Sequence, residues 1–450
     1  MSASLHFATA LLPDGWARDV RITVQGGLIA AVDAGVAPGA DARHAIALPG
    51  LPNLHSHAFQ RGMAGLAEVR GTSDDSFWTW REIMYRFVDR LTPDDLAAIA
   101  ALAYAEMLES GFTRVGEFHY LHHDRDGRPF ADPAAMSGAI MAAARETGIA
   151  LTHLPVFYAH AGFGGSTPGD GQRRFIHDLD GFATLLDAAR AEAATLPDAV
   201  VGIAPHSLRA VTPDELAVLV PLAGGAPIHI HIAEQVREVE DCLAFSGARP
   251  VAWLLDHAPV GPDWCLVHAT HMTEAETVAL ARSGAVAGLC PITEANLGDG
   301  LFPAEAFLAA GGRYGVGSDS NVRIDATEEL RLLEYGQRLV RRGRNLLAEP
   351  GGSTGGALYR AALAGGAQAL GAQVGLRVGA PADIVSLDAD HPSLATRSGD
   401  ALLDGLLFAA GREAIDRVWR RGREVVTNGR HVAHATIATR YRAALARLLA

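Results

Sequence analysis

Short apolar runs of strand length alternate with longer helical stretches through the middle of the chain. The apolar runs occupy residues 51–57, 113–120, 151–158, 200–207, 227–234, 265–270, 285–291 and 313–320. The stretches between them, such as 92–111 and 273–284, are rich in Ala, Leu and Glu and have helical spacing. Eight repeats of strand and helix predict a (β/α)8 TIM barrel. An open doubly wound sheet is the alternative, but no GxGxxG sequence follows the first run.

The two ends of the chain share a different pattern. Residues 1–48 contain short alternating segments that are broken by glycine pairs, and the segment from residue 379 onward behaves in the same way, with a tight turn at Asn428-Gly429. The last residues, 436–450, have helical spacing. We therefore predict a small β-sandwich domain assembled from residues 1–48 and 379–450, including a terminal helix, beside a barrel over residues 49–378.

Charge and composition narrow the classes of partner. The chain of 450 residues carries 38 Lys+Arg against 51 Asp+Glu, a formal net charge of −13. This acidic balance argues against nucleic acid and anionic membranes, which bind clustered positive charge. The sequence contains no lysine, so neither a lysine Schiff base nor a carbamylated lysine between two metals is available. Three cysteines without a CxxC, and no leader or membrane-length apolar run, lead us to expect a cytoplasmic protein.

Polar and ionisable residues recur where the predicted strands end. They are His55, His57, Glu117, His119, Tyr120, His206, His229, His231, Glu234, His268 and Asp319. A single polar strand tip is common by chance, but six strand tips of this kind in one ring are not. Since function in a TIM barrel gathers at the carboxyl ends of its strands, the ring indicates one catalytic site.

Four of these residues form a plausible ligand set for a divalent cation. His55 and His57 alternate along a strand and so project to the same face. Together with His231 and Asp319 they offer a three-histidine, one-aspartate set that suits zinc and leaves a position for water. His229 shares the strand face of His231, but His231 is nearer the tip. Without lysine to bridge a second ion, we expect a mononuclear site.

A bound ion of this kind supplies hydroxide at neutral pH, and a hydrolysis also needs protons for the leaving group. Glu234 and His268 are the candidates for this transfer because each follows a strand end beside the predicted ligands. Asp319 can also accept a proton from the water. The sequence leaves the division of the proton transfers among these three residues open.

The pattern HxH…HxxE…H…D over strands one, five, six and eight resembles the amidohydrolase superfamily, in particular its mononuclear aminohydrolases. The terminal β-domain with "RVGAPADIVSLD" is similar to that superfamily as well. Four further segments, "HSHAFQRGMAGLAE", "FWTWREIMYRF", "EFHYLHH" and "APHSLRAV", resemble the formimidoylglutamate deiminase family. That resemblance implies hydrolysis of N-formimino-L-glutamate to N-formyl-L-glutamate and ammonia in histidine degradation, and a homodimer. It implies substrate contacts from Gln60, Arg81, Tyr120, His206 and Arg209, beside the ligands and acid–base residues named above.

The chemistry of this substrate is consistent with the arginines. N-Formimino-L-glutamate has two carboxylates and an amidinium-like head, and Arg81 and Arg209 can each offer a bidentate fork to a carboxylate. On sequence alone, Arg81 could instead be a surface residue of a helix, Tyr120 a packed aromatic, and Gln60 a loop cap. A heterocycle deaminase, with a flat pocket for a purine or pyrimidine, is the alternative enzyme. A barrel that holds a structural metal in a closed site is the non-enzymatic alternative.

Three other features have simpler interpretations. We predict that Phe77, Trp78 and Trp80 form a packed lid or an interface. The adjacent His122 and His123 are expected in solvent, as part of a loop. The segment 290–300 follows the seventh strand and could line the pocket through Asn296.

Overall fold

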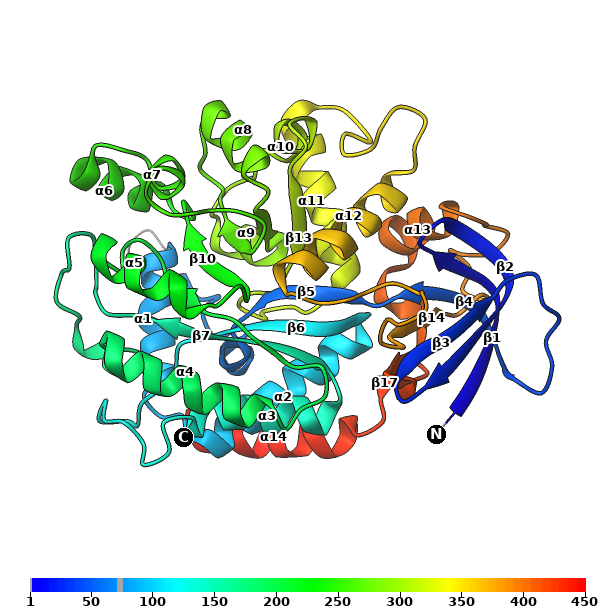
Figure 1. Ribbon diagram of the computed structural model, residues 1–450, viewed down its shortest axis with the longest axis horizontal. Coiled ribbons are helices and arrows are strands. Elements are labelled where there is room, and N and C mark those ends of the chain that lie inside the picture. The colour runs from blue at the N-terminus through cyan, green and yellow to red at the C-terminus, as the bar shows by residue number, and fades with distance from the viewer. Residues whose placement is uncertain (1, 71–75) are drawn as a thin grey trace.

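Eight strand positions follow one another around a closed barrel in the computed structural model, which describes residues 2–70 and 76–450 (Figure 1). They are β5 (Leu51–Ser56), β6 (Phe112–His119), β7 (Ala150–Phe157), β8 (Val200–Val201) with β9 (Ala204–Pro205), β10 (Ile228–Ile232), β11 (Trp264–His268), β12 (Val286–Leu289) and β13 (Arg313–Val316). Parallel ladders join β5 through β8, and β10 through β13. The eight strands confirm the predicted (β/α)8 barrel.

Two seams close the barrel between these ladders. At the first seam, Ile203 pairs with Ile228 and Ser207 pairs with His231, so the fourth strand joins the fifth. At the second seam, Ser56 pairs with Asp319, which joins the first strand to the segment that follows the last. The carboxyl ends of the first and last strands are therefore neighbours.

Helices cover the outside of the barrel and extend its loops. They are α1 (Phe77–Val88), α2 (Pro93–Glu109), α3 (Ala135–Thr147), α4 (Leu179–Ala193), α5 (Pro213–Leu222), α6 (Val236–Ser246), α7 (Pro250–His257), α8 (Glu274–Ser283), α9 (Pro291–Leu297), α10 (Ala304–Ala309), α11 (Ala326–Arg341) and α12 (Thr354–Ala369). Short 3-10 helices add η1 (Ala58–Met63) and η2 (Asp170–Gln172). α12 packs closely on β13. The glycine at position 365 permits this approach, because a Cβ atom there would collide with the Tyr314 carbonyl oxygen.

Helix starts follow local capping chemistry. α2 and α5 each begin with Thr-Pro followed by acidic residues, and α8 begins with Thr-Glu. In each case the threonine hydroxyl accepts the N–H of the residue three positions later, whose carboxylate accepts the threonine N–H. This reciprocal pairing satisfies two amide donors that the first turn would leave free, so the sequence fixes where these helices begin.

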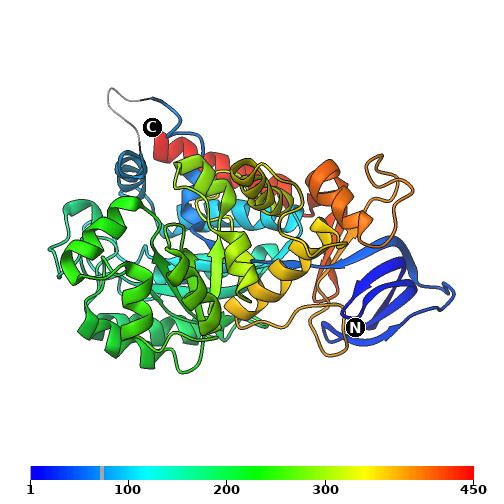
Figure 2. The same cartoon turned by 90° about the horizontal axis from the view of Figure 1, so that it is seen from above.

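The strands from the two termini form one small sheet beside the barrel (Figures 1 and 2). They are β1 (Ser2–Leu12), β2 (Gly15–Gln25), β3 (Leu28–Asp33), β4 (Ala42–Pro49), β14 (Ile384–Leu387), β15 (Ile415–Arg420), β16 (Arg423–Thr427) and β17 (Arg430–His431). Their order is β17-β16-β15-β14-β4-β1-β2-β3, so β14 pairs with β4 at the junction of the two ends.

This sheet curls over its own core. Three strand spacings, about 14 Å in a flat sheet, separate β1 from β15. Yet the ring centroids of Phe7 on β1 and Trp419 on β15 are only 6.0 Å apart, and their planes are perpendicular. The small β-domain expected from both termini is thus one curled eight-stranded sheet in place of two separate ones.

The remaining C-terminal elements connect the sheet to the barrel. α13 (Ala401–Gly405), the π-helix η3 (Leu406–Ala410) and the 3-10 helix η4 (Gly411–Ala414) precede β15. The last helix, α14 (His434–Leu449), lies along α2 of the barrel, where Arg447 Nη2 is 2.7 Å from Asp95 Oδ1. Over the described ranges 2–70 and 76–450, every helix is too short or too polar to cross a bilayer.

Candidate active site

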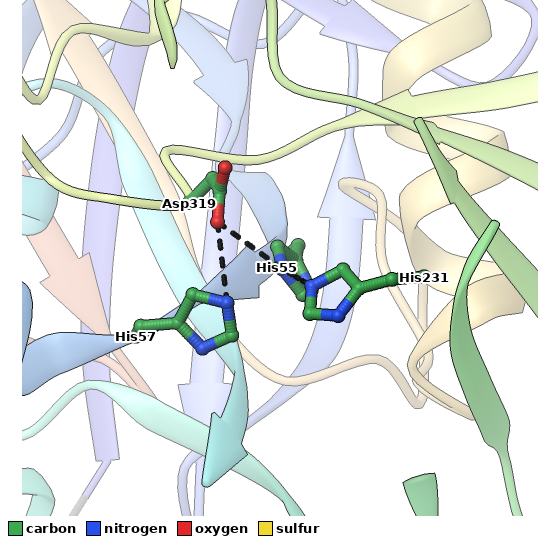
Figure 3. A group of neighbouring side chains, drawn as sticks. All are labelled: His55, His57, His231 and Asp319. Carbon is green, nitrogen blue, oxygen red and sulfur yellow. Dashed lines mark hydrogen bonds and ion pairs between the residues drawn. The ribbon is translucent and has the colours of Figure 1, made fainter. Parts of the chain in front are cut away.

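Four side chains from three strand ends converge at one mouth of the barrel (Figure 3). His55 and His57 come from β5 and the residue after it, His231 comes from β10, and Asp319 follows β13. Asp319 Oδ1 lies 3.3 Å from the Nε2 atoms of both His55 and His57. The potential ligand atoms of all four residues lie within 4.8 Å of one another. The residues chosen from the sequence as metal ligands therefore lie together.

The orientation of the imidazoles fits a shared cation. His57 Nδ1 donates to the carbonyl oxygen of Phe118 at 2.8 Å, which leaves the lone pair of Nε2 directed at Asp319. The Nε2 atoms of His55 and His231 face each other at 3.0 Å. Three imidazole nitrogens and one carboxylate, all buried, make a donor set that suits a borderline divalent cation with one position for water.

His229 lies deeper in the barrel than His231. Its Nε2 atom is 2.7 Å from the carbonyl oxygen of Ala369, at the end of α12. The two histidines of β10 point to the same side of the strand, as their spacing requires. Only His231, nearer the strand tip, reaches the cluster.

The barrel seam holds Asp319 in place. Its backbone N–H donates to His55 O at 3.0 Å, and its carbonyl oxygen accepts from His57 N at 2.9 Å. The amide of Asn321 donates to His57 O and Ser56 Oγ at 3.0 and 3.1 Å. Asp319 has a φ of 42°, an unfavourable conformation for a residue with a Cβ. These backbone bonds fix that conformation, and with it the direction of the carboxylate.

Glu234 and His268 lie beside the four-residue cluster. His268 Nε2 is 3.8 Å from Glu234 Oε1 and 3.9 Å from Asp319 Oδ2. Burial raises the pKa of Glu234 to about 7 against the opposing effects of His268 and Arg209. Burial alone would lower the pKa of His268, but Glu234, a hydrogen bond with Glu294 and the charge of Asp319 raise it to about 10. A carboxyl group that titrates near neutrality can both take and give a proton at physiological pH.

A cavity of about 590 Å³ opens directly over the cluster. Its lining includes His57, His231, Asp319, Glu234 and His268, together with all five of the predicted substrate-binding residues Gln60, Arg81, Tyr120, His206 and Arg209. Phe77, Trp80, Met84, Tyr85, Tyr158 and Phe175 provide most of the apolar wall. One cavity is thus lined by three of the four candidate ligands, the candidate acid–base pair and two arginines.

The two arginines approach the cavity from different elements. Arg81 belongs to α1, and Arg209 follows β9. Their Nε atoms are buried and lack a hydrogen-bond partner among the residues that the structure describes. Both guanidinium groups lie over the Trp78 ring, at 4.6 Å for Arg81 and 5.8 Å for Arg209. A buried Arg209 and a half-buried Arg81, facing one cavity, are suited to a ligand with two negative charges.

The three other predicted contacts form one wall of the cavity. Gln60 Nε2 donates to the hydroxyl of Tyr120 at 2.8 Å, while Gln60 Oε1 has no partner within the described part of the chain. The His206 ring packs between Tyr120 and His231, with centroid distances of 5.9 and 4.9 Å. Tyr120 is both packed and exposed to the cavity, so the two interpretations of this residue are compatible.

Some cavity residues were not singled out from the sequence. Tyr158 follows β7 directly and could therefore have been found as a strand tip. Its hydroxyl accepts from Gln172 Nε2 at 2.7 Å in the cavity wall. Tyr85 and Met84 lie on α1, which no strand pattern places near the site. The aromatic residues Phe77 and Trp80 of the same helix line the cavity, in agreement with a packed lid.

Two expectations about loop residues are wrong. His122 and His123 are buried, at 2% and 5% exposure, because the loop after β6 folds onto Arg174, whose carbonyl oxygen accepts both backbone N–H groups. Asn296 does not line the main cavity but donates to Glu68 Oε1 at 2.8 Å near the surface. From the same segment, Glu294 reaches the site, with Oε1 3.2 Å from His268 Nδ1.

The family of the chain follows from its match to known proteins. The model described as "Amidohydrolase family" matches residues 46–425, so the chain belongs to the amidohydrolase family. A second model, "Formimidoylglutamate deiminase HutF, N-terminal domain", matches residues 3–45, the first three strands of the small sheet. The family match thus covers the barrel and part of the small sheet, and the narrower match covers the first strands of that sheet.

Individual relatives agree with this assignment. A formimidoylglutamate deiminase from Pseudomonas aeruginosa is 54% identical over 448 residues, or 98% of each chain. A 5-methylthioadenosine/S-adenosylhomocysteine deaminase from Natronomonas pharaonis is 30% identical and aligns over 87% of this chain and 84% of its own. The crystal structure of an amidohydrolase from Brucella melitensis superimposes with a TM-score of 0.97, at 55% identity and full coverage of both chains.

Proposed function

We propose that this protein is a formimidoylglutamate deiminase, a hydrolase of carbon–nitrogen bonds in linear amidines. It converts N-formimino-L-glutamate and water to N-formyl-L-glutamate and ammonia, a step of histidine degradation. The observation that carries the proposal is the presence of Arg81 and Arg209 in the same cavity as the ligand cluster. The 54% identity to a formimidoylglutamate deiminase over nearly the whole chain supports it.

The substrate is held by its two carboxylates in this proposal. Arg81 and Arg209 each donate to a carboxylate, and a guanidinium can do so through two parallel hydrogen bonds. Gln60, Tyr120 and His206 add donors along the same wall. A purine or pyrimidine ring has no carboxylate to offer, so it would leave the buried Arg209 and the half-buried Arg81 without partners, which is costly. The cavity therefore favours the linear dicarboxylate over a heterocycle.

Bond cleavage requires that the formimino carbon gains a water oxygen and loses ammonia. When bound by His55, His57, His231 and Asp319, a divalent cation lowers the pKa of a coordinated water towards ~7. Glu234 is placed to take a proton from the attacking water and to deliver it to the departing nitrogen. His268 assists this transfer. Its Nε2 atom faces the carboxylates of Glu234 and Asp319 at 3.8 and 3.9 Å.

We further propose that the ion is zinc, with one ion per chain, since the donor set is nitrogen-rich and the chain has no lysine to bridge a second metal. A homodimer in the cytoplasm is proposed from the family resemblance. Metal analysis of the purified protein tests the identity and number of the ions. Sedimentation at several protein concentrations tests the homodimer.

Ammonia release from a panel of substrates tests the reaction. The panel is N-formimino-L-glutamate, S-adenosylhomocysteine, adenosine, guanine and cytosine, with metal content measured on the same sample. We expect release from N-formimino-L-glutamate at a kcat/KM at least a hundredfold above that for any heterocycle. Preferred release from a heterocycle would reject the proposal in favour of a nucleoside or nucleobase deaminase. No release from any compound by the metal-loaded protein would favour a structural metal site.

A further inference from the structure

A buried carboxylate outside the ligand cluster contacts the far side of the His268 ring. Glu294 Oε1 lies 3.2 Å from His268 Nδ1, and both side chains are buried, at 6% and 1% exposure. The opposite ring nitrogen, Nε2, faces Glu234 and Asp319. His268 is therefore held from both ends, but only the Nε2 end looks into the cavity.

Glu294 is itself fixed by the helix to which it belongs. It is the fourth residue of α9, and its Oε1 atom accepts the backbone N–H of Cys290, the residue before the helix, at 2.8 Å. The same turn is tied to the metal side of the barrel by a hydrogen bond from Thr293 Oγ1 to Ser318 O at 3.3 Å. A carboxylate that already accepts from a backbone amide is rigid and acts as an acceptor, so His268 Nδ1 must donate to it.

The backbone of His268 explains why such support is needed. His268 and Ala269 have φ values of 69° and 47° at the tip of β11, and residues with a Cβ rarely adopt this region. The ring also stacks on His231, with centroids 5.6 Å apart and an angle of 14° between the planes. Stacking fixes the plane of the ring, but it leaves open which nitrogen faces the cavity.

We propose that Glu294 is a positioning residue for the hydrolysis, which accepts the Nδ1–H of His268 and so directs Nε2 toward Glu234. The inference rests on the proposed function, since it assumes that His268 takes part in proton transfer there. Glu294 touches neither substrate nor metal in this scheme. It acts only through His268, in the way that an outer carboxylate fixes the orientation of a functional histidine.

A capping role alone is the competing explanation, and the chain provides a matched control for it. Glu215 is the third residue of α5, where its carboxylate accepts the Thr212 N–H at 2.7 Å and lies 3.0 Å from His160 Nε2. Like Glu294, it accepts the N–H of the residue before its helix and contacts a histidine, but the cavity lining includes His268 and not His160. Glu215→Gln and Glu294→Gln therefore remove the same kind of carboxylate from the first turns of two helices.

Kinetics of the two variants with N-formimino-L-glutamate test the proposal. We expect Glu294→Gln to lower kcat by about 10- to 100-fold, with KM within threefold and metal content unchanged. Glu215→Gln should shift Tm by a similar amount but keep kcat within twofold. In a His268→Asn background, Glu294→Gln should lower kcat no further, since a residue that acts through His268 has nothing left to position.

Three outcomes would overturn the assignment. They are a kcat of Glu294→Gln within twofold of the parent, a loss that merely follows loss of metal, and a full additional loss in the His268→Asn background. A readout that is independent of the substrate separates this result from failure of the proposed function. In 15N spectra of the imidazoles, the His268 signals, assigned by their absence in His268→Asn, should show an Nδ1–H that is hydrogen-bonded to a carboxylate in the parent, and this Nδ1 signal should shift in Glu294→Gln. An unchanged Nδ1 signal would also refute the proposal.

Discussion

The guanidinium carbon of Arg81 lies 4.6 Å from the centre of the Trp78 indole ring. Arg237 of α6 approaches the same ring at 4.9 Å. A ring that attracts several cations can offset the repulsion between them, with about 0.5–2 kcal/mol per contact. Trp78 thus holds α1, which carries Arg81, against the rest of the cavity wall.

Replacement of this indole should therefore weaken substrate binding more than turnover. We expect Trp78→Leu to raise KM for N-formimino-L-glutamate by about 3- to 30-fold, with kcat within threefold, and Trp78→Phe to restore most of the loss. Trp253→Leu is the control, because this indole stacks on His257, whereas Trp78 faces the two cavity arginines. Equal KM values for the Trp78→Leu and parent enzymes would exclude the role.

The arginines can be tested through the charge of the substrate. Arg209→Ala should raise KM for N-formimino-L-glutamate by about 10- to 150-fold, the loss expected when a hydrogen bond to a charged group of ~1.5–3 kcal/mol disappears. Arg341→Ala, an exposed arginine paired with Glu305, should leave KM unchanged. If KM stays the same in Arg209→Ala, the substrate carboxylates bind elsewhere.

Glu234 should affect the chemical step. We expect Glu234→Gln to lower kcat by about 10²- to 10⁴-fold, since amide nitrogen cannot relay the proton, while the bound metal is retained. Glu240→Gln on the exposed face of α6 serves as the control. Steady-state kinetics with parallel metal analysis decide the matter, and a kcat within a few-fold of the parent would remove Glu234 from the mechanism.

Removal of the ion should abolish ammonia release reversibly. Without the ion, the ligand cluster has nothing that would lower the pKa of the attacking water. Dialysis against a chelator is therefore expected to leave less than about 1% of the activity. Stoichiometric Zn²⁺ should restore it. Persistent activity in protein shown to be metal-free would contradict the assignment of His55, His57, His231 and Asp319.

A substitution at the junction between the barrel and the small sheet should change stability without changing catalysis. Arg420 of β15 is buried, donates to Asp198 Oδ1 and Oδ2 at 3.1 Å each, and also contacts Asp383. Arg420→Ala removes these hydrogen bonds, leaving Asp198 only with Arg114 at 3.5 Å and Asp383 with the Arg421 N–H, and should lower the free energy of unfolding by about 1.5–3 kcal/mol. Arg423→Ala, at an exposed position of the next strand, should change it little. Chemical denaturation measures both, and kcat per folded molecule should be unchanged.

Some of these relationships could be predicted from the sequence, because they depend on the alternation of side chains along a strand and on the order of the strands in the barrel. His55 and His57 must share a strand face, and the carboxyl ends of barrel strands must meet, so their convergence with His231 and Asp319 follows from counting. The proximity of Glu234 and His268 follows from the same argument.

Other relationships depend on how loops and helices fold back, which local sequence does not encode. The burial of His122 and His123 follows from contacts with Arg174, some fifty positions away. For the segment after β12, the sequence analysis named Asn296, whereas the geometry of α9 brings Glu294 to His268 instead. Arg81 needed the placement of α1 over the cavity, which no strand pattern supplies.

The seam between the first and last barrel strands has a consequence for biosynthesis. Two ligands lie at the start of the barrel and Asp319 at its end, while β4 finds its partner β14 only after residue 383. A nascent chain on the ribosome therefore exposes two histidines and an unpaired sheet edge until most of the protein has been made. Contacts of such long range slow folding. We thus expect this chain to reach its native state, and its metal, only after translation is nearly complete.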